Sequence, residues 1–183
     1  MDGEVPVKAL KSSPLKLLHE NPFSKVYHSH ADFGDITKDY YITHFGPRSG
    51  IVAVRDNCVL MVQQYRFLPD EIGLEIPGGK VEDGEDPVQA AIRECQEETA
   101  VVCRNLKPLV VYYPGLDNVE NRTSLFYTDD VTDTETFVPD IGEALKVEWV
   151  PIDRCVEMIF QEQIMDAFTI AGVMSYVVLQ SRR

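Results

Sequence analysis

The stretch from Gly78 to Val101 constrains this chain more than any other, because it predicts a glycine turn that leads into an acidic helix. Asp86 is a favourable N-cap residue, and Pro87 suits the first helical position. Apolar residues then recur at the i, i+3, i+4, i+7 spacing of one helical stripe: Val88, Ala91, Ile92 and Cys95. We therefore expect a helix that packs this stripe on a core.

Three glutamates of the same helix, Glu94, Glu97 and Glu98, fall on a sector away from the apolar stripe. At about 100° per residue, they lie within about 100° of one another. Carboxylates spaced i, i+4 on a helix repel each other. A solvated acidic face would explain any one of them, whereas a divalent cation explains the group, because Mg²⁺ prefers oxygen ligands and Mn²⁺ shares this preference. Gly78 would let a backbone carbonyl approach the same ions.

The composition is that of one folded domain, with 183 residues of which 44% are hydrophobic. A net charge of −13, from 17 basic and 30 acidic residues, argues against nucleic acid as a partner. It does not argue against a small phosphate compound, because a bound cation can invert the local charge. No apolar run reaches the ~18 residues of a membrane span, and the N-terminus lacks the apolar segment of a secretory signal. We therefore expect a cytoplasmic protein without a membrane partner.

The cysteines are Cys58, Cys95, Cys103 and Cys155, and none of them forms a CxxC pair. Three of them fall in apolar-patterned segments. This placement favours buried reduced thiols over disulfides or zinc ligands.

Strand-like segments dominate the chain, with helices inserted and at the C-terminal end. Residues 1–46 are expected to form a loose tail and a small antiparallel β extension, with strands at 15–19, 25–30 and 40–45. Residues 47–183 are expected to form the main domain, with strands at 51–55, 59–66, 109–113, 123–128 and 145–150, an acidic loop at 129–143, and closing helices at 152–160 and 164–179. The pattern indicates an α+β sandwich rather than regular βαβ alternation.

Residues 79–101 resemble the Nudix box, the signature of the Nudix hydrolases. The matching residues are Gly79, Glu85, Arg93, Glu94, Cys95, Glu97, Glu98 and Val101. Every charged position of the motif fits, and Cys95 at an apolar position is a mild change. Ala100 replaces the usual glycine after the helix, so the bend there must form without glycine's freedom at positive φ. The resemblance implies a Nudix-type α/β/α sandwich with a mixed sheet.

Other segments resemble the ADP-ribose pyrophosphatase branch of this family. They are Gln63–Arg66, Leu74–Gly79, Tyr113–Gly115 with Glu120, Glu143–Val147, Trp149–Pro151 and Gln163–Gly172. This resemblance implies hydrolysis of a diphosphate bond, with ADP-ribose giving AMP and ribose 5-phosphate, and two to three Mg²⁺ or Mn²⁺ ions per site. Another nucleotide sugar such as GDP-mannose, or a non-catalytic Nudix-fold sensor, stays open. The N-terminal extension is similar to an element that forms a domain-swapped homodimer in this branch, so we expect a homodimer.

The resemblance also implies roles for individual residues. The implied metal ligands are the Gly78 carbonyl, Glu94, Glu97, Glu98 and Glu143. Glu143, or otherwise Glu97, would accept the proton of the attacking water. Arg66, Lys80, Pro114 and Glu120 would contact substrate, although plain strand-end and loop charges would also explain Arg66, Lys80 and Glu120. Gly79, Glu85 and Arg93 would be structural, with Glu85 pairing with Arg93.

Overall fold

The computed structural model describes residues 8–134 and 146–182. These residues divide into two compact units. The smaller unit contains 8–46 and the later segment 113–122, so it is discontinuous in sequence. The larger unit contains 47–112 together with 123–134 and 146–182.

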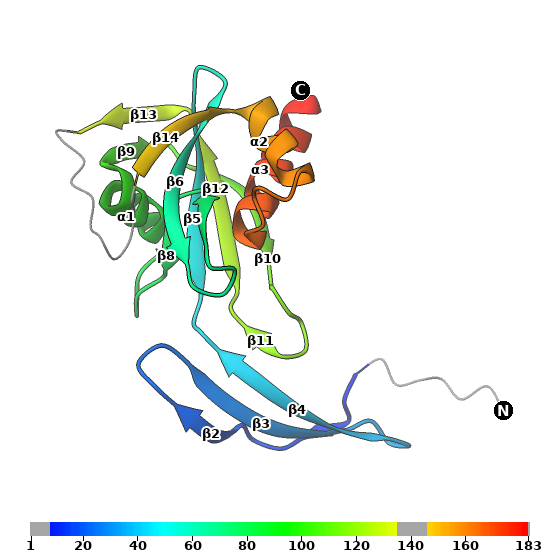
Figure 1. Cartoon of the computed structure of the whole chain (residues 1–183). Helices are drawn as coiled ribbons and strands as arrows, with labels where there is room; N and C mark the ends of the chain where they lie inside the picture. Colours follow the sequence, from blue (N-terminus) through cyan, green and yellow to red (C-terminus); the bar gives the residue numbers. More distant parts are fainter. Residues whose placement is uncertain (1–7, 135–145, 183) are drawn as a thin grey trace. The chain divides into compact units, whose positions relative to one another are not determined.

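The smaller unit is a five-stranded sheet in its described residues (Figure 1). Its strands are β1 (Lys11–Ser12), β2 (Lys16–Glu20), β3 (Lys25–Asp32), β4 (Thr37–His44) and β11 (Val119–Glu120). The long strands β3 and β4 form an antiparallel hairpin, and β2 pairs with the other edge of β3. The short strand β11 runs parallel to β4, with Val119 opposite Thr43.

The larger unit is built on a mixed sheet that has seven strands among the described residues. These strands are β5 (Arg48–Arg55), β6 (Cys58–Arg66), β7 (Glu71–Glu75), β8 (Gly78–Lys80), β10 (Lys107–Tyr112), β12 (Thr123–Thr128) and β14 (Lys146–Pro151). The main order is β10-β12-β5-β6-β14, with β7 on β6 and β8 on β5. The β12–β5 pair is parallel and the others are antiparallel. A separate two-stranded sheet pairs β9 (Val101–Arg104) with β13 (Asp130–Asp133).

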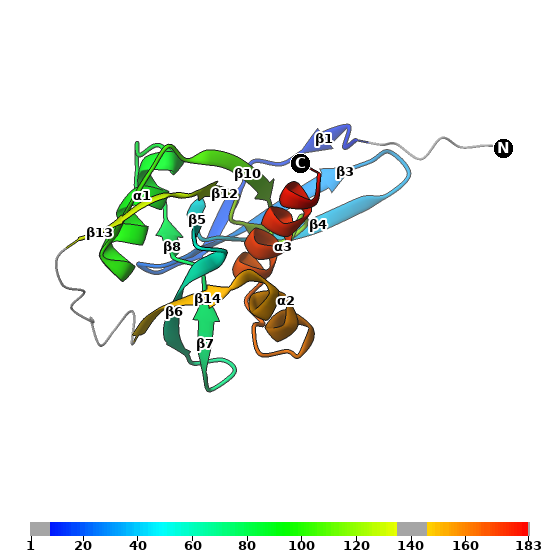
Figure 2. The ribbon, with the colours of Figure 1, turned by 90° about the horizontal axis from the view of Figure 1, so that it is seen from above.

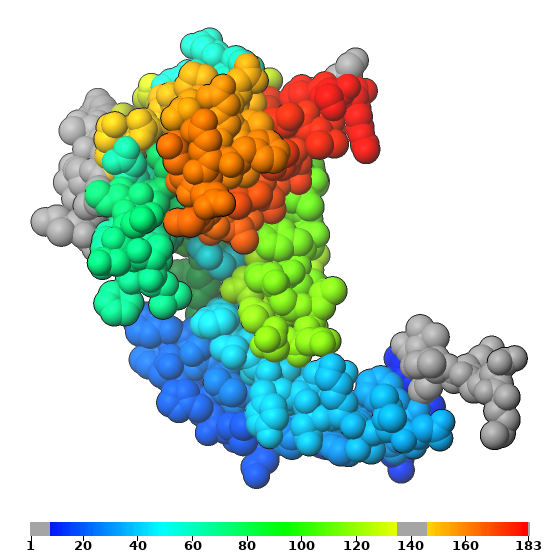
Figure 3. Space-filling view, turned by 45° about the vertical axis from the view of Figure 1, so that its right-hand side comes forward, coloured from blue at the N-terminus to red at the C-terminus, as the bar shows by residue number. Residues whose placement is uncertain are grey.

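Helices cover both faces of this mixed sheet. Helix α1 (Pro87–Thr99) lies on one face, and α2 (Ile152–Phe160) and α3 (Ala167–Ser181) lie on the other (Figures 1 and 2). Figure 3 shows α2 and α3 in orange and red as one continuous layer. The expected α/β/α sandwich is thereby confirmed. In the part of the chain that the structure describes, no helix combines the length and apolar character that a membrane crossing requires.

Strand β5 joins the two halves of the core. Its side chains alternate, so Ile51 and Ala53 pack in the cluster under α1, while Val52 and Val54 pack in the cluster under α3. A strand covered on both faces is apolar throughout, which explains its unbroken apolar run. All four cysteines are free, and three of them are buried, as the sequence predicts.

The sequence analysis did not predict strands β1, β7, β9 and β11, and three further details of the expected element pattern differ from the structure. The acidic loop at 129–143 contains strand β13, and residues 135–145 lie outside the described residues. Gly78–Lys80 form strand β8 on β5 rather than only a turn. Helix α3 begins at Ala167 instead of residue 164, because the Asp166 carboxylate caps it by accepting a hydrogen bond from the Thr169 N–H at 2.7 Å.

Candidate active site

Helix α1 begins where the sequence predicts. The Asp86 carboxylate accepts a hydrogen bond from the Val88 N–H at 2.8 Å, and Pro87 is the first helical residue. The hydroxyl of Ser49, on β5, donates to the Pro87 carbonyl at 2.6 Å. Cys95 is fully buried in the cluster shared with β5, so the start and the apolar face of α1 are both fixed against the sheet.

The end of α1 shows how Ala100 replaces the expected glycine. Ala100 adopts the left-handed conformation, with φ 56° and ψ 23°, and its N–H donates to the Gln96 carbonyl at 2.9 Å. A residue with a Cβ pays about 1–2 kcal/mol for this conformation. The bend is therefore preserved, and strand β9 starts directly after it at Val101.

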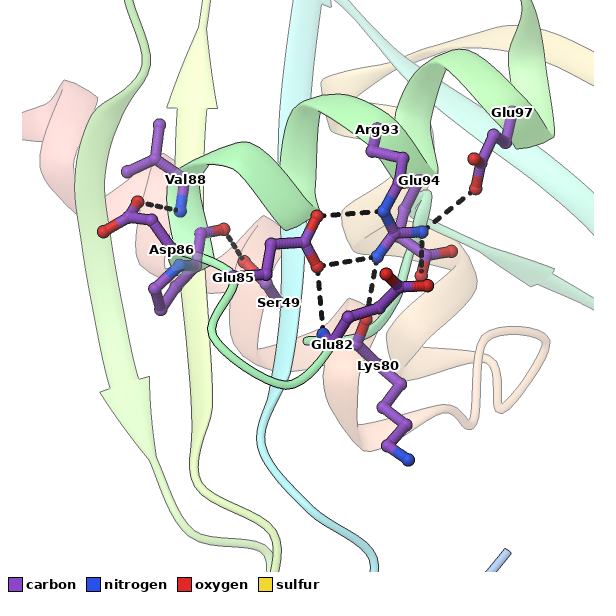
Figure 4. A network of polar contacts seen from close by, with 10 residues as sticks. Ser49, Lys80, Glu82, Glu85, Asp86, Val88, Arg93, Glu94 and Glu97 are labelled. Atoms are coloured by element: carbon purple, nitrogen blue, oxygen red, sulfur yellow. Dashed lines mark hydrogen bonds and ion pairs between the residues drawn. The ribbon is translucent and has the colours of Figure 1, made fainter. Parts of the chain in front are cut away.

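Arg93, on α1, is the central residue of a polar network that involves the helix and the segment before it (Figure 4). Its guanidinium donates to both carboxylate oxygens of Glu85, each at 2.9 Å, so the expected ion pair is present. It also donates to Glu94 at 2.9 Å, to Glu97 at 3.0 Å and to the Lys80 carbonyl at 3.0 Å. The hydrogen bonds from Arg93 hold the pKa of Glu85 below its usual value, and Glu85 is the main cause that raises the pKa of Arg93. This network joins the loop before α1 to the helix itself.

The carboxylates of Glu94 and Glu98 both lie against the backbone of β8. The Gly78 N–H donates to Glu98 Oε2 at 2.8 Å. A Cβ added to Gly79 would lie 2.4 Å from the Glu94 carboxylate carbon, so Glu94 occupies the space that a side chain would fill. Burial raises the pKa of Glu94, and the neighbouring Arg93 acts in the opposite direction. The two glycines thus bring two acids of one helix onto one short backbone segment.

The acids of α1 lie at its C-terminal half, where the helix macrodipole is unfavourable to them. An exposed carboxylate at that end costs about 0.3–1 kcal/mol. Helix α1, which is described along its whole length, has no basic residue in its last turn. Arg93 offsets part of the repulsion through Glu94 and Glu97, and the side chain of Glu97 remains 56% exposed. Glu143, the other predicted acid, lies outside the described residues.

The predicted substrate residues fall in both units. Arg66 ends β6 and Lys80 ends β8, both in the larger unit. Lys80 is exposed, and its carbonyl accepts from Arg93. Pro114 and Glu120 belong to the segment of the smaller unit that contains β11. There Glu120 forms an ion pair with His44, with 2.6 Å between Oε2 and Nε2.

One residue that the sequence analysis did not single out is Glu75, the partner of Arg66. Two hydrogen bonds of 2.6 and 2.5 Å join the Arg66 guanidinium to the two carboxylate oxygens of Glu75. Alternation between the apolar residues Leu74 and Ile76 places Glu75 on the opposite side of the strand, which is normally a solvated side. The structure instead leaves only 10% of its side chain exposed. The sequence contained one signal for this pair: Arg66 lies nine positions before Glu75, on the other strand of the β6–β7 hairpin.

The donor set of Glu94 and Glu98 fits a divalent cation. Both carboxylates converge on the Gly78–Gly79 backbone, where oxygen ligands suit Mg²⁺. Among the described residues, no three His, Cys, Asp or Glu side chains are arranged to enclose an ion. Two carboxylates are nevertheless sufficient, because Mg²⁺ usually keeps several waters and takes its remaining ligands from substrate phosphates.

Comparisons with known proteins agree with this arrangement. The NUDIX domain profile matches residues 44–168. The CMP-5'-(N-acetyl-N-hydroxy-3-aminopropyl)phosphonate hydrolase of Streptomyces rubellomurinus is 27% identical over 172 residues, which are 92% of this chain and 82% of that protein. The ADP-ribose pyrophosphatase of Bacillus subtilis is 25% identical over 137 residues, or 74% of each protein. A solved structure of an ADP compounds hydrolase has a TM-score of 0.79, covers 96% of this chain and 94% of that one, and shares the fold at 13% identity.

The chain therefore belongs to the NUDIX domain family. It is a pyrophosphohydrolase of that family, as the Nudix box predicts.

Proposed function

We propose that the chain uses Mg²⁺, or Mn²⁺ in its place, to hydrolyse ADP-ribose to AMP and ribose 5-phosphate. The observation that carries this proposal is the pair of carboxylates, Glu94 and Glu98, that α1 holds against the backbone of Gly78 and Gly79. The activity named for the Bacillus subtilis relative supports the choice of ADP-ribose. The activity named for the Streptomyces relative supports the alternative of another nucleotide-linked substrate, such as GDP-mannose or a cytidine compound.

In the proposed reaction, water attacks one phosphorus of the diphosphate, and the bond from that phosphorus to the bridging oxygen breaks. A carboxylate accepts the proton of the water, with Glu143 as first choice and Glu97 as second. In the structure one oxygen of Glu97 is engaged by Arg93, and the side chain is exposed enough to reach solvent. Arg66 and Lys80 would bind the phosphates, because their cationic groups form strong charge-assisted hydrogen bonds.

Glu94 and Glu98, with Glu97, Glu143 and the Gly78 carbonyl, would hold two to three divalent ions. Bound divalent cations supply charge neutralisation of the diphosphate and a water of lowered pKa. Arg93 and Glu85 would keep the helix and the preceding loop in register, and Gly79 would leave room for Glu94.

Substrate turnover is tested by phosphate release from ADP-ribose, GDP-mannose and a CMP-linked compound, with Mg²⁺ and a phosphatase that attacks the monoester products. We expect ADP-ribose to be the best substrate, and Glu98→Gln to lower kcat/KM by a factor of about 100 or more. Glu157→Gln, the same change on an exposed helical glutamate of α2, is the matched control and should keep full activity. Full activity of Glu98→Gln would show the metal assignment to be wrong, and ligand binding without turnover of any compound would favour the sensor.

Metal binding has a readout of its own. A ligand that binds the folded state raises its stability with concentration. Mg²⁺ should therefore raise the melting temperature of the native chain, and should raise it much less in Glu94→Gln and Glu98→Gln. An equal rise in all three proteins would place the ion elsewhere.

We also propose that the protein is a cytoplasmic homodimer. Large apolar side chains are exposed in both units, among them Phe23 at 85%, Phe67 at 83% and Leu68 at 95%. Exposed apolar groups of this kind often mark association surfaces. Light scattering after gel filtration would measure the mass, and a mass near the 20.7 kDa of one chain would contradict the dimer.

A further inference from the structure

Arg66 lines an open pocket of about 590 Å³ in the larger unit. The pocket lies between the β6–β7 hairpin and the segment that precedes α3, which Figure 3 shows in blue-green and orange. Its lining is mainly apolar, with Leu68, Ile72 and Met165 beside the polar groups. This volume is within the range of small-molecule sites, which is roughly 300–1,000 Å³. The guanidinium of Arg66 is therefore placed where a ligand could reach it.

Arg66 and Glu75 form a bidentate ion pair, a clamp in which Glu75 is the more buried side chain. Nε of Arg66 donates to Oε1 of Glu75 at 2.6 Å, and Nη2 donates to Oε2 at 2.5 Å. The Glu75 side chain is 10% exposed and the Arg66 side chain 45% exposed. Glu75 is thus the fixed partner, and the arginine is the end that faces outward.

Only one edge of the guanidinium is used in this clamp. A guanidinium carries five N–H donors in a rigid plane, and Glu75 accepts from two of them. The hydrogen bonds to Glu75 are the largest cause that raises the pKa of Arg66, and the charges of Asp166 and Glu98 add to it. The charge of Glu98, one of the two acids that converge on Gly78 and Gly79, therefore also acts on Arg66.

We infer that Glu75 is a positioning residue for substrate binding, which holds Arg66 side-on so that its remaining N–H groups face the substrate's phosphates. This inference rests on the proposed function. Arginine has a long side chain with many rotamers, and ordering it at the moment of binding opposes affinity. Glu75 imposes that order beforehand. It also supplies the negative charge that lets an arginine remain fixed when no phosphate is bound.

Gly73 supports this reading, because it leaves room for the clamp. A Cβ on Gly73 would lie 3.1 Å from Oε1 of Glu75 and 3.7 Å from Cγ of Arg66. The first of these distances is tighter than most real Cβ contacts. Gly73→Ala should therefore displace the Glu75 carboxylate without changing any charge.

A double-mutant cycle tests the inference through kcat and KM for ADP-ribose. Glu75→Gln keeps the side-chain shape but loses the charge and one acceptor, and we expect it to raise KM about 10-fold with kcat changed less than about 3-fold, as for lost ground-state binding. Arg66→Met should raise KM at least as much. Because Glu75 is proposed to act through Arg66, the double variant should match Arg66→Met within about 2-fold. An unchanged KM in Glu75→Gln, or a full further 10-fold increase in the double variant, would overturn the inference.

Three further measurements distinguish a loss of Arg66 positioning from a loss of stability and from a failure of the proposed function. Glu157→Gln is the matched control, since Glu157 is an exposed glutamate of α2 that does not line this pocket and pairs with Arg154 rather than Arg66. Its KM should stay native. Gly73→Ala should reproduce part of the KM increase, and a native KM in a folded Gly73→Ala protein would count against the clamp. If the native chain does not turn over ADP-ribose, the proposed function fails, and the same cycle is then decided by the Kd of inorganic diphosphate in the presence of Mg²⁺.

Discussion

Replacing Gly79 with alanine should separate the position of Glu94 from the stability of the fold. The new Cβ would lie 2.4–2.5 Å from the carboxylate atoms of Glu94. Van der Waals contact between such atoms requires about 3.5 Å, so the carboxylate must move by about 1 Å. Gly79 does not need a positive φ, and the atoms that must give way are the far end of a flexible side chain. The protein should therefore fold, with Glu94 displaced.

The expected loss of activity is large and the expected loss of stability small. A displacement of about 1 Å in a reacting constellation can lower the rate about 100-fold, which corresponds to about 2.7 kcal/mol in the activation free energy. Moving one side chain off its preferred rotamer costs about 0.5–1.5 kcal/mol. Each kcal/mol lowers the melting temperature by about 2–4 °C for a chain of this size.

The assay is phosphate release from ADP-ribose, paired with thermal unfolding of the same preparation. Gly84→Ala is the matched control, because Gly84 lies in the loop that follows β8 and its Cβ would meet nothing within 4 Å. With φ at +81°, it should lose some stability and keep its activity. Native kcat/KM in Gly79→Ala would refute the idea that Glu94 acts from its place against β8.

Ala100→Gly should stabilise the protein by about 0.5–1 kcal/mol. Glycine removes the strain of an alanine in the left-handed conformation after α1, and the greater flexibility of glycine in the unfolded chain offsets part of this gain. Urea unfolding measures this, and Ala90→Gly inside the same helix should instead destabilise by about 1 kcal/mol; a loss in both variants would contradict the relief of strain. Gly78→Ala should lower the free energy of unfolding by about 3 kcal/mol or more. Its Cβ would lie 2.5 Å from the Ser49 carbonyl oxygen, and this backbone atom, unlike the end of a side chain, cannot move away. Asp39→Asn should lower stability only above about pH 4. Hydrogen bonds from His30 and His28 lower the pKa of Asp39, so its contribution exists above the unfolded pKa of about 3.9 and is lost as pH falls through the folded pKa. Thermal unfolding from about pH 6 to about pH 3 should show the two proteins converging, and a constant gap would refute the assignment.

Local signals in the sequence were sufficient to predict α1 and its acids. Asp86, Pro87 and the apolar stripe ending at Cys95 act within one helix, and the structure contains the cap, the proline and the buried face where expected. The ion pair of Glu85 with Arg93, which the resemblance to the Nudix box implies, is also present. The additional hydrogen bonds from Arg93 to Glu94 and Glu97 depend on side-chain geometry that spacing alone does not specify.

Features that depend on distant partners could not be predicted in the same way. Gly78 and Gly79 have poor strand propensity, yet they pair with Gly50 and Ser49 on β5. Gly78 approaches β5 so closely that a Cβ would lie 2.5 Å from the Ser49 carbonyl oxygen, whereas Gly79 leaves room for Glu94. The burial of Glu75 depends on Arg66 across a hairpin, and period-two alternation carries no information about such a partner. These are tertiary effects that override local preference.

The discontinuity of the smaller unit has a consequence for how the protein is synthesised. Lys38, on β4, forms an ion pair with Asp117, and 79 positions separate the two residues. A ribosome that adds about 5–20 residues per second needs on the order of 10 seconds to cover that interval. Throughout this time β4 has its hairpin partner β3 but lacks β11 on its other edge. An unpaired strand edge readily accepts a foreign strand. Nascent chains paused before residue 113 should therefore be the species most prone to mispairing.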